Sequence, residues 1–481
     1  MYIFFLILLG LFLRIINIDK PEGLWNDEYV SWMISATPFA KGFFQEILRQ
    51  CHMPLYYFYL KLFAYCNDLV LRLTSVIPSL FSIPIMYLVG KEFSKKTGKI
   101  CAILTTVLPF LVYYSQEVRF YSLLFLESTV LLFFIIRVIN DKKHAWIGYI
   151  LSSLILLLTH VLGFIFVGLS FIYLIYKKKK LTKSMLFFLI ASALIVIPFG
   201  INILSMRPSS QWWGSFSYTN ILFLFSDYLS PILTNHVNAP KIFFYNKEFL
   251  FSFLILVPTL FGIYLIIKGI KKAYGLFFII LGSIIITALL AITGNIVFIT
   301  KYTIEILPVL ILLLALGVEN RFDKILLFLF IAIQLISVLT PYYPTKALHK
   351  EGHKLVGDIL NNIETDKVIF TYYNPDRFYR YYEPKSEVRY ISKINCLEYL
   401  NSPENIIKDV QKGENITLVI LDSVSFIPKN LIKDAELANV PKMFIIFSKI
   451  RNSLLKEIDK NYKNYKVQHS GSWIVITAEK M

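Results

Sequence analysis

The sequence contains little cysteine and little charge for its length. Four of its 481 residues are cysteines, and none has the close spacing of a zinc or redox motif. Charged residues make up 17% of the chain, whereas they make up about 25% of ordinary soluble domains. A cysteine-based metal centre is therefore excluded and a soluble domain is disfavoured. We expect Cys51 and Cys66 to be unpaired.

The sequence also lacks the short motifs of nucleotide-dependent and serine-based chemistry. It has no Walker sequence, no glycine pattern of a dinucleotide-binding fold and no serine nucleophile motif. The net charge is +17, but the basic residues do not suggest one folded basic face, so no nucleic-acid partner is expected. No nucleotide cofactor is expected either.

The sequence contains long runs of apolar residues. The chain is 56% hydrophobic with a mean hydropathy of +0.60, and its apolar blocks reach the about 20 residues that a spanning helix needs. We predict a multi-pass α-helical membrane protein with about 11 transmembrane helices. The predicted spans lie near residues 2–18, 69–90, 100–115, 118–138, 146–160, 161–176, 184–203, 248–267, 274–293, 304–320 and 324–340.

Basic clusters between alternate pairs of spans predict the orientation in the cell membrane. By the positive-inside rule these loops are cytoplasmic. They contain Lys91, Lys95, Lys96, Lys99, Lys142, Lys143, Lys177 to Lys180, Lys183, Lys268, Lys271, Lys272, Arg321 and Lys324. The N-terminus is then cytoplasmic and the C-terminal part extracytoplasmic. Residues 1–18 lack the basic start and the cleavage site of a signal peptide, so they are predicted as the first span.

The composition changes after about residue 342. Residues 367–373 and 416–422 have the pattern of buried strands, and 465–479 that of a hairpin turning at Ser470 and Gly471. Residues 401–412 and 452–462 have helix start signals. We therefore predict two domains: a transmembrane domain over 1–341 and a small extracytoplasmic α/β domain over 342–481.

Two adjacent carboxylates, Asp27 and Glu28, follow the first span on the predicted outer side. Carboxylates near lipid are costly and are often functional. They could equally begin a solvated loop, with Asp27 as the cap of a short helix. The flanking residues Trp25 and Trp32 suit an interfacial aromatic belt.

Further polar groups fall on the same predicted side. His52 begins an amphipathic segment, 52–63, expected to lie in the membrane interface as a helix with Pro54 in its first turn. Glu117 and Arg119 are predicted at a hairpin tip between two spans, where they either neutralise each other or form a second charged wall of a cavity.

Three more candidates come from later breaks between spans. His160 separates two apolar runs and is either structural or part of a site. Lys301, next to Tyr302, either extends to the interface or binds a phosphate as a point charge. Arg207 is a second candidate cation in the loop 204–247.

Together these groups could carry out group transfer. Acids can accept the proton of a hydroxyl group, cations can stabilise a departing phosphate, and aromatic faces can bind a sugar or a lipid. A lipid-linked phosphodiester at the outer leaflet therefore suits the site better than a cytoplasmic nucleotide. The alternative is a transporter or flippase of a lipid-linked saccharide, which would need ionisable residues within the membrane or broken helices in paired halves. Arg14 and Glu127 are ionisable residues within the predicted spans, so their surroundings bear on that alternative.

Five short motifs follow one another over residues 1–320, after Arg14 in the first helix. They are W-x-D-E at Trp25–Glu28, H-x-P-L-Y-Y at His52–Tyr57, S-Q-E-x-R-x-Y at Ser115–Tyr121, T-H-x-x-G at Thr159–Gly163, and the pair Lys301–Tyr302 followed by Pro308. This series resembles the GT-C fold glycosyltransferases, specifically the family of protein O-mannosyltransferases, aminoarabinose transferases and their prokaryotic relatives. Met53 replaces a proline that is common in the family.

The resemblance implies an activity and its residues. It implies a transferase that moves a hexose or pentose from a polyprenyl-phosphate donor to a hydroxyl of a lipid, glycan or protein acceptor, with inversion, on the extracytoplasmic face. Asp27 would be the general base, supported by Glu28. Lys301, where the family commonly has Arg, would bind the donor phosphate, and Glu117 with Arg119 forms the second acidic motif.

The remaining candidates complete the implied donor and acceptor site. His52, His160, Tyr302 and Arg207 would bind donor or acceptor. Members of the family differ in metal dependence, so a divalent metal stays open, with Glu117 and His160 as candidate ligands. The domain that often accompanies eukaryotic protein mannosyltransferases is not evident, which puts a protein acceptor in doubt. The C-terminal domain resembles no family.

Overall fold

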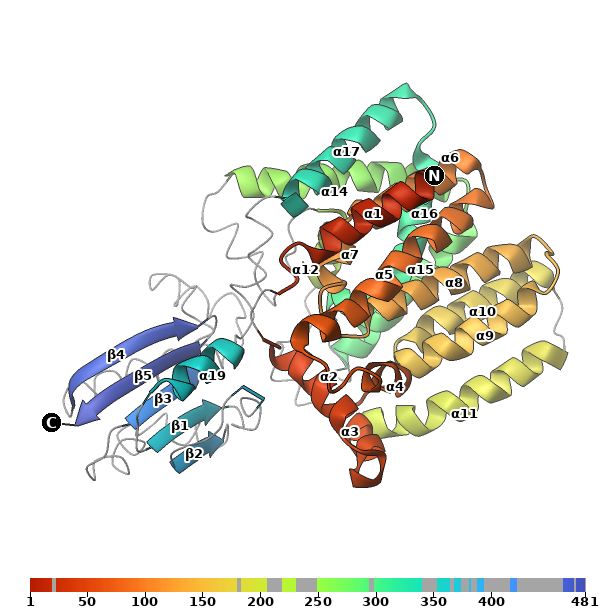
Figure 1. The fold of residues 1–481 in the computed structure, drawn as a ribbon. Coiled ribbons are helices and arrows are strands. Elements are labelled where there is room, and N and C mark those ends of the chain that lie inside the picture. Colours follow the sequence, from red (N-terminus) through yellow and green to blue (C-terminus); the bar gives the residue numbers. More distant parts are fainter. Residues whose placement is uncertain are drawn as a thin grey trace. The chain divides into compact units, whose positions relative to one another are not determined.

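The computed structural model describes most of the helical part of the chain and the central strands of the C-terminal part (Figure 1). The described residues are 1–19, 23–179, 183–205, 219–230, 249–293, 298–339, 353–363, 367–372, 380–381, 387–392, 416–421, 462–470 and 473–480. They divide into two compact units, the first formed by 1–18, 31–235 and 243–343 and the second by 19–30, 236–242 and 344–481. Residues 19–30 thus cluster with the C-terminal unit.

The first unit is helical throughout its described residues. Its helices are α1 (Tyr2–Ile15), η1 (Phe39–Lys41), α3 (Phe43–Arg49), α4 (Leu55–Lys61), α5 (Asp68–Lys91), α6 (Lys95–Val107), α7 (Pro109–Tyr114), α8 (Tyr121–Ile139), α9 (Ala145–Thr159), α10 (Gly163–Lys178), α11 (Lys183–Ser205), α12 (Thr219–Leu229), α14 (Phe249–Ile270), α15 (Tyr274–Ile292), η3 (Thr300–Ile306), α16 (Leu307–Gly317) and α17 (Arg321–Leu339). Helix α2 (Asn26–Ala36) begins in the second unit and ends in the first. A predominantly helical fold is confirmed.

Five segments of the described chain are long and apolar enough to cross a membrane. They are Asp68–Lys91, Tyr121–Ile139, Tyr274–Ile292, Thr300–Gly317 and Arg321–Leu339. Shorter apolar helices occur at Tyr2–Ile15, Ala145–Thr159, Ile190–Phe199 and Leu256–Ile270. The chain therefore has the helices of a multi-pass membrane protein, while the number of about 11 spans and the orientation stay predictions.

The predicted span 100–115 is broken in two by Pro109. Proline has no N–H to donate to the carbonyl of Thr105, four residues earlier, and it favours an extended residue before it. Helix α6 ends at Val107, and Leu108 is extended with φ −60° and ψ 120°. The guanidinium of Arg14 donates to the carbonyl oxygens of Thr105 at 3.0 Å and Thr106 at 3.1 Å. This arginine therefore satisfies backbone groups that the break exposes.

Glu117 and Arg119 lie in the predicted break between two helices, α7 and α8, and this segment is buried. The side chain of Gln116 turns inward and donates to the carbonyl oxygens of Arg14 at 3.0 Å and Ile16 at 2.7 Å. Helix α4 is also shorter than the predicted 52–63, because Pro54 caps it instead of lying in its first turn. Cys51 and Cys66 are free thiols, as predicted.

The second unit contains a mixed five-stranded sheet in the order β2-β1-β3-β5-β4. The strands are β1 (Lys367–Tyr372), β2 (Glu387–Ser392), β3 (Ile416–Leu421), β4 (Tyr462–Ser470) and β5 (Trp473–Lys480). Strands β1, β2 and β3 are parallel, and β5 is antiparallel to both β3 and β4. The predicted strands and hairpin are confirmed, whereas β2 was not predicted.

The described α-helix of this unit after residue 344 is α19 (His353–Asn361), in which Val356 and Leu360 are buried. The predicted helix 401–412 lies outside the described residues, and so do residues 452–461 of the predicted helix 452–462. The candidate Arg207 also lies outside them. Tyr462, the last residue of the predicted helix 452–462, begins strand β4 instead.

Candidate functional site

Helix α2 places the two carboxylates of the first motif in its first turn. The backbone N–H of Trp25 donates to Oε2 of Glu28 at 3.2 Å, which is the acidic half of a capping box. Glu28 is fully buried and Asp27 half-buried. The prediction of Asp27 as the cap is wrong: the helix begins at Asn26, so Asp27 lies within the helix and Glu28 does the capping.

Residues before α2 are held by the second unit, to which they belong. The backbone N–H of Leu24 donates to the phenolic oxygen of Tyr381 at 2.7 Å. Gly23 has φ +78°, and a Cβ there would lie 2.4 Å from Cβ of Lys354, so only glycine fits. The start of the helix that carries Asp27 is thus fixed by residues more than 300 positions away in sequence.

The turn between α7 and α8 positions the second acidic motif within the first unit. Glu117 and Arg119 are 1% and 4% exposed. The N–H of Arg119 donates to the carbonyl oxygen of Glu117 at 2.7 Å, and the hydroxyl of Ser75 also donates to that oxygen. The guanidinium of Arg119 donates to Oγ of Ser31 at 3.2 Å. Ser31 lies one turn after Asp27 on α2, so the two residues share a face of that helix.

His160 lies in a stack of rings between α9 and α10. Its ring is 4.9 Å from that of Phe120 and 6.1 Å from that of Tyr302, both in stacked orientation. The ring of His52 is 6.0 Å from Phe120 on another side. The motifs beginning at His52, Ser115, Thr159 and Lys301 therefore meet at Phe120. Within the described chain, the buried Nδ1 of His160 has no hydrogen-bond partner.

Two cations from distant motifs lie against one aromatic ring. The guanidinium of Arg119 is 5.8 Å from the ring centre of Tyr121, and Nζ of Lys301 is 5.7 Å from the same centre. Lys301 is also 5.5 Å from the ring of Tyr302 and is only 8% exposed. Two cations from motifs distant in sequence therefore lie near one ring.

Helix α12 contributes a buried carboxylate that was not predicted. Oδ2 of Asp227 accepts a hydrogen bond from the hydroxyl of Thr300 at 2.6 Å, directly before Lys301. The next residue, Tyr228, donates to the carbonyl oxygen of Thr300 at 3.0 Å. Burial, and then the negative charges of Glu305 and Asp227, raise the pKa of Tyr228 against the opposing effect of its hydrogen bond with Thr303. The phenol therefore stays protonated and can donate.

A signal for Asp227 was present in the sequence. It is the one acid among the apolar residues 219–229, and an isolated carboxylate in such a run is a functional candidate by itself. The prediction treated 204–247 as a plain outer loop and so missed it. In the structure, Asp227 and Tyr228 hold the turn η3 that carries Lys301.

The site does not fit a metal through its described residues. No group of three or more histidine, cysteine, aspartate and glutamate side chains in the described ranges could hold an ion. Glu117 and His160, the candidate ligands, therefore lack a third such neighbour there.

Comparison with known families confirms the resemblance inferred from the motifs. The family described as dolichyl-phosphate-mannose-protein mannosyltransferase matches residues 52–201. This region contains the motifs of His52, Glu117 and His160. No curated protein matches the chain.

Solved structures share the fold over nearly the whole chain. A crystal structure of ArnT from Cupriavidus metallidurans bound to undecaprenyl phosphate has a TM-score of 0.50 and 10% identity, covering 99% of this chain and 98% of ArnT. The apo state of the same protein has a TM-score of 0.52 and 9% identity, with 99% and 97% covered. At these identities the two structures show a common fold.

Proposed function

We propose that the protein is an integral-membrane glycosyltransferase that uses a polyprenyl-phosphate sugar. The match to the mannosyltransferase family and the fold shared with an undecaprenyl phosphate-binding protein support this activity. The transfer takes place on the extracytoplasmic side, where the predicted topology puts every motif. The donor is anchored in that leaflet by its lipid chain, so no nucleotide is needed at the site.

The donor phosphate binds between the cations of the site, and this single observation carries the proposal. Lys301 and Arg119 lie within 6 Å of the same tyrosine ring although 182 residues separate them in sequence. A phosphate close to both would accept charge-assisted hydrogen bonds from them. The stacked rings of Phe120, His160 and Tyr302 offer apolar faces for the sugar.

The acceptor hydroxyl loses its proton to Asp27. The acceptor oxygen attacks the anomeric carbon and forms the new glycosidic bond, while the bond from that carbon to the phosphate oxygen breaks with inversion. The departing polyprenyl phosphate keeps the electron pair, and Lys301 and Arg119 stabilise its added negative charge. Glu28 keeps the start of α2 in place through its bond with Trp25.

A flippase of a lipid-linked saccharide is the alternative. It would use ionisable residues within the membrane, and both residues that bear on it have local partners. Arg14 binds Ser79 on α5 at 2.7 Å as well as the carbonyl groups of α6, so it joins three helices. Glu127 accepts from the hydroxyl of Thr159 at 2.8 Å. These contacts favour structural roles for both.

Titration of the purified protein with undecaprenyl phosphate, followed by native mass spectrometry, tests the donor site. Replacing Lys301 with Met should weaken binding about 100-fold, because a hydrogen bond to a charged group contributes up to about 3 kcal/mol. Lys301→Arg should retain most of the affinity, because arginine also carries the charge. The matched control is Lys142→Met, which removes an exposed lysine from the loop after α8.

Two outcomes would contradict the proposal. Equal affinity of the wild type and Lys301→Met would remove Lys301 from the phosphate site. Co-purification of a long pyrophosphate-linked oligosaccharide, in place of a polyprenyl-phosphate sugar, would favour the flippase.

A further inference from the structure

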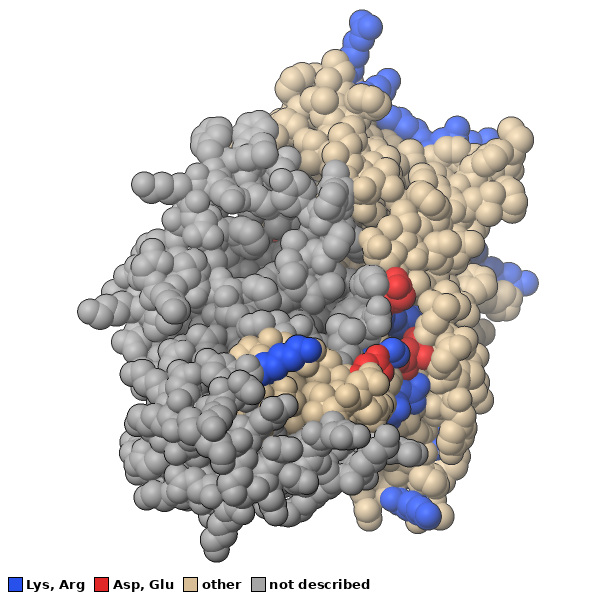
Figure 2. All heavy atoms as spheres, turned by 60° about the vertical axis from the view of Figure 1, so that its left-hand side comes forward, with Lys and Arg blue, Asp and Glu red and all other residues tan. Residues whose placement is uncertain are grey.

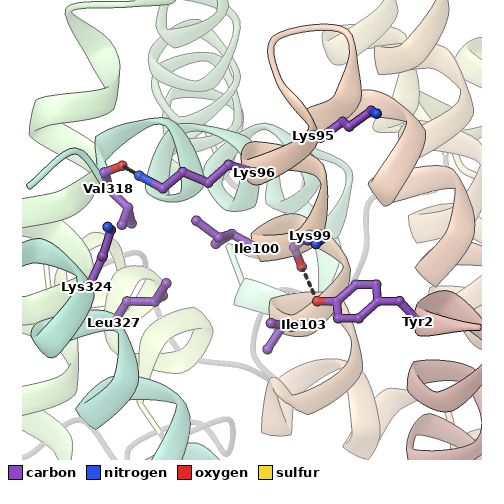
Figure 3. A pocket seen from close by; sticks show the side chains of 9 residues that line it. All are labelled: Tyr2, Lys95, Lys96, Lys99, Ile100, Ile103, Val318, Lys324 and Leu327. Carbon is purple, nitrogen blue, oxygen red and sulfur yellow. Dashed lines mark hydrogen bonds between the residues drawn. The ribbon is translucent and has the colours of Figure 1, made fainter.

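A second basic pocket lies away from the candidate site, among α1, α6 and α17 (Figure 3). It has a volume of about 450 Å³, which is within the range of ligand pockets. It is lined by lysines 96 and 99 of α6 and by Lys324 of α17, together with the apolar side chains of Ile100 and Leu327. Figure 3 shows Lys96 extending across the pocket to Val318, with Lys324 pointing toward the same space and Lys95 pointing away.

The lysines of this pocket have no acidic partner among the described residues. Neither Lys96, Lys99 nor Lys324 forms an ion pair within the described ranges. The nearby acids, Glu319 and Asp323, are paired with other lysines. Those pairs are Asp323 with Lys268 at 2.6 Å and Glu319 with Lys272 at 2.9 Å. Positive charge is therefore in excess in the pocket.

The local structure makes this excess unfavourable without an anion. Lys96 lies in the first turn of α6, which contains no acid, and a cation at a helix N-terminus opposes the helix dipole. Burial, and then the charges of Lys324 and Lys272, lower the pKa of Lys96. Figure 2 shows basic side chains at the upper end of the described face.

Exposed apolar side chains occur on both helices that flank α6 at the pocket. Phe5 and Phe12 on α1 are 58% and 52% exposed, and Phe328 on α17 is 70% exposed. In a membrane protein such surfaces face lipid. Helix α6 contacts both α1 and α17, so it joins the two helices. Lysine side chains and apolar side chains thus occur together at the pocket, which suits a phospholipid with its charged phosphate and its apolar acyl chains.

We propose that this pocket binds the phosphate-bearing headgroup of an anionic phospholipid, in the leaflet that faces the basic loops. Lys96, Lys99 and Lys324 contact the headgroup phosphate, and the hydroxyl of Tyr2, which already donates to the carbonyl oxygen of Lys99 at 3.2 Å, closes one side. The acyl chains lie against Ile100, Leu327 and the exposed phenylalanines. This site is separate from the proposed transfer reaction and does not depend on it.

Native mass spectrometry of the full-length protein in nanodiscs tests the proposal. In discs of phosphatidylcholine with a minor share of phosphatidylglycerol, the wild type should retain phosphatidylglycerol. A Lys96→Gln and Lys324→Gln double variant should bind it about 25-fold more weakly, since each lysine near an anionic lipid contributes about fivefold. The matched control is Lys142→Gln with Lys143→Gln, which removes the same charge from another loop on the same predicted side and should bind like the wild type.

A second variant and a second probe keep the test decisive. Lys99→Gln with Lys324→Gln leaves the hydrogen bond from Lys96 to Val318 intact, so its loss of phosphatidylglycerol cannot come from that backbone contact. Equal retention by the wild type and both pocket variants would overturn the proposal. So would binding of inorganic phosphate, added to pure phosphatidylcholine discs, that the pocket variants weaken as much as they weaken binding of phosphatidylglycerol, because the site would then bind free phosphate.

Discussion

The backbone N–H of Leu24 donates a hydrogen bond of 2.7 Å to the phenolic oxygen of Tyr381. Leu24 is fully buried, so this group has no water to replace that partner. Because Leu24 lies three residues before Asp27, the bond fixes the chain just ahead of the proposed base. The C-terminal part of the protein thereby acts on the geometry of the first motif.

Replacing Tyr381 with Phe should therefore slow transfer about fivefold while leaving binding of the lipid donor unchanged. The lost hydrogen bond is worth about 1 kcal/mol, and a displaced base lowers the rate of the chemical step. The measurement compares the kcat of transfer and the Kd of the lipid donor between Tyr381→Phe and the wild type. Tyr176→Phe, which changes a 70% exposed phenol, is the control. A fall in donor affinity with unchanged kcat would refute this account of Tyr381.

Asp227 should affect donor binding through the turn that carries Lys301. Asp227→Ala removes the acceptor of the Thr300 hydroxyl, and we expect about tenfold weaker binding of undecaprenyl phosphate. Asp227→Asn keeps an acceptor oxygen and should lose less. Asp141→Ala, at an 85% exposed position, should have no effect. If Asp227→Ala binds undecaprenyl phosphate as the wild type does, Asp227 does not position Lys301.

Asp323 should stabilise the helical unit at the start of α17. Its carboxylate accepts hydrogen bonds from Lys268 at 2.6 Å and from the N–H groups of Glu319 at 2.9 Å and Asn320 at 3.0 Å. Asp323→Asn keeps the size of the side chain but removes the charge that pairs with Lys268, so it should lower Tm at pH 7.

Asp358→Asn is the control, because its pair with Lys354 is exposed on both sides and such pairs contribute little. An equal Tm of the wild type and Asp323→Asn would show that the pairing of Asp323 does not stabilise the helical unit.

Much of the helical part could be predicted because hydropathy decides it. The predicted segment 69–90 differs from the observed helix by one residue at each end, and 274–293 by one residue at its C-terminal end. Four of the five motifs, those of His52, Ser115, Thr159 and Lys301, also meet in space, through contacts of the rings of Phe120, Tyr121 and His160. Length and apolar content sufficed for these predictions.

The missed features depend on contacts distant in sequence. The break at Pro109 exposes carbonyl groups that Arg14, from another helix, satisfies. Strand β2 has a charged, alternating sequence, and its pairing with β1 decides its conformation. The bond from Leu24 to Tyr381 crosses 357 positions. Local pattern carries no information on such partners.

The state of the lipid bound to Asp27→Asn, purified gently from its own membranes, tests the central claim most directly. Native mass spectrometry would give the ratio of sugar-charged to bare polyprenyl phosphate. Glu28→Gln is the control, because its amide oxygen can still accept from Trp25, and it should change the ratio less. If Asp27 is the base, Asp27→Asn retains the sugar-charged donor while the wild type retains mainly the bare lipid. The same ratio in both proteins would contradict the account.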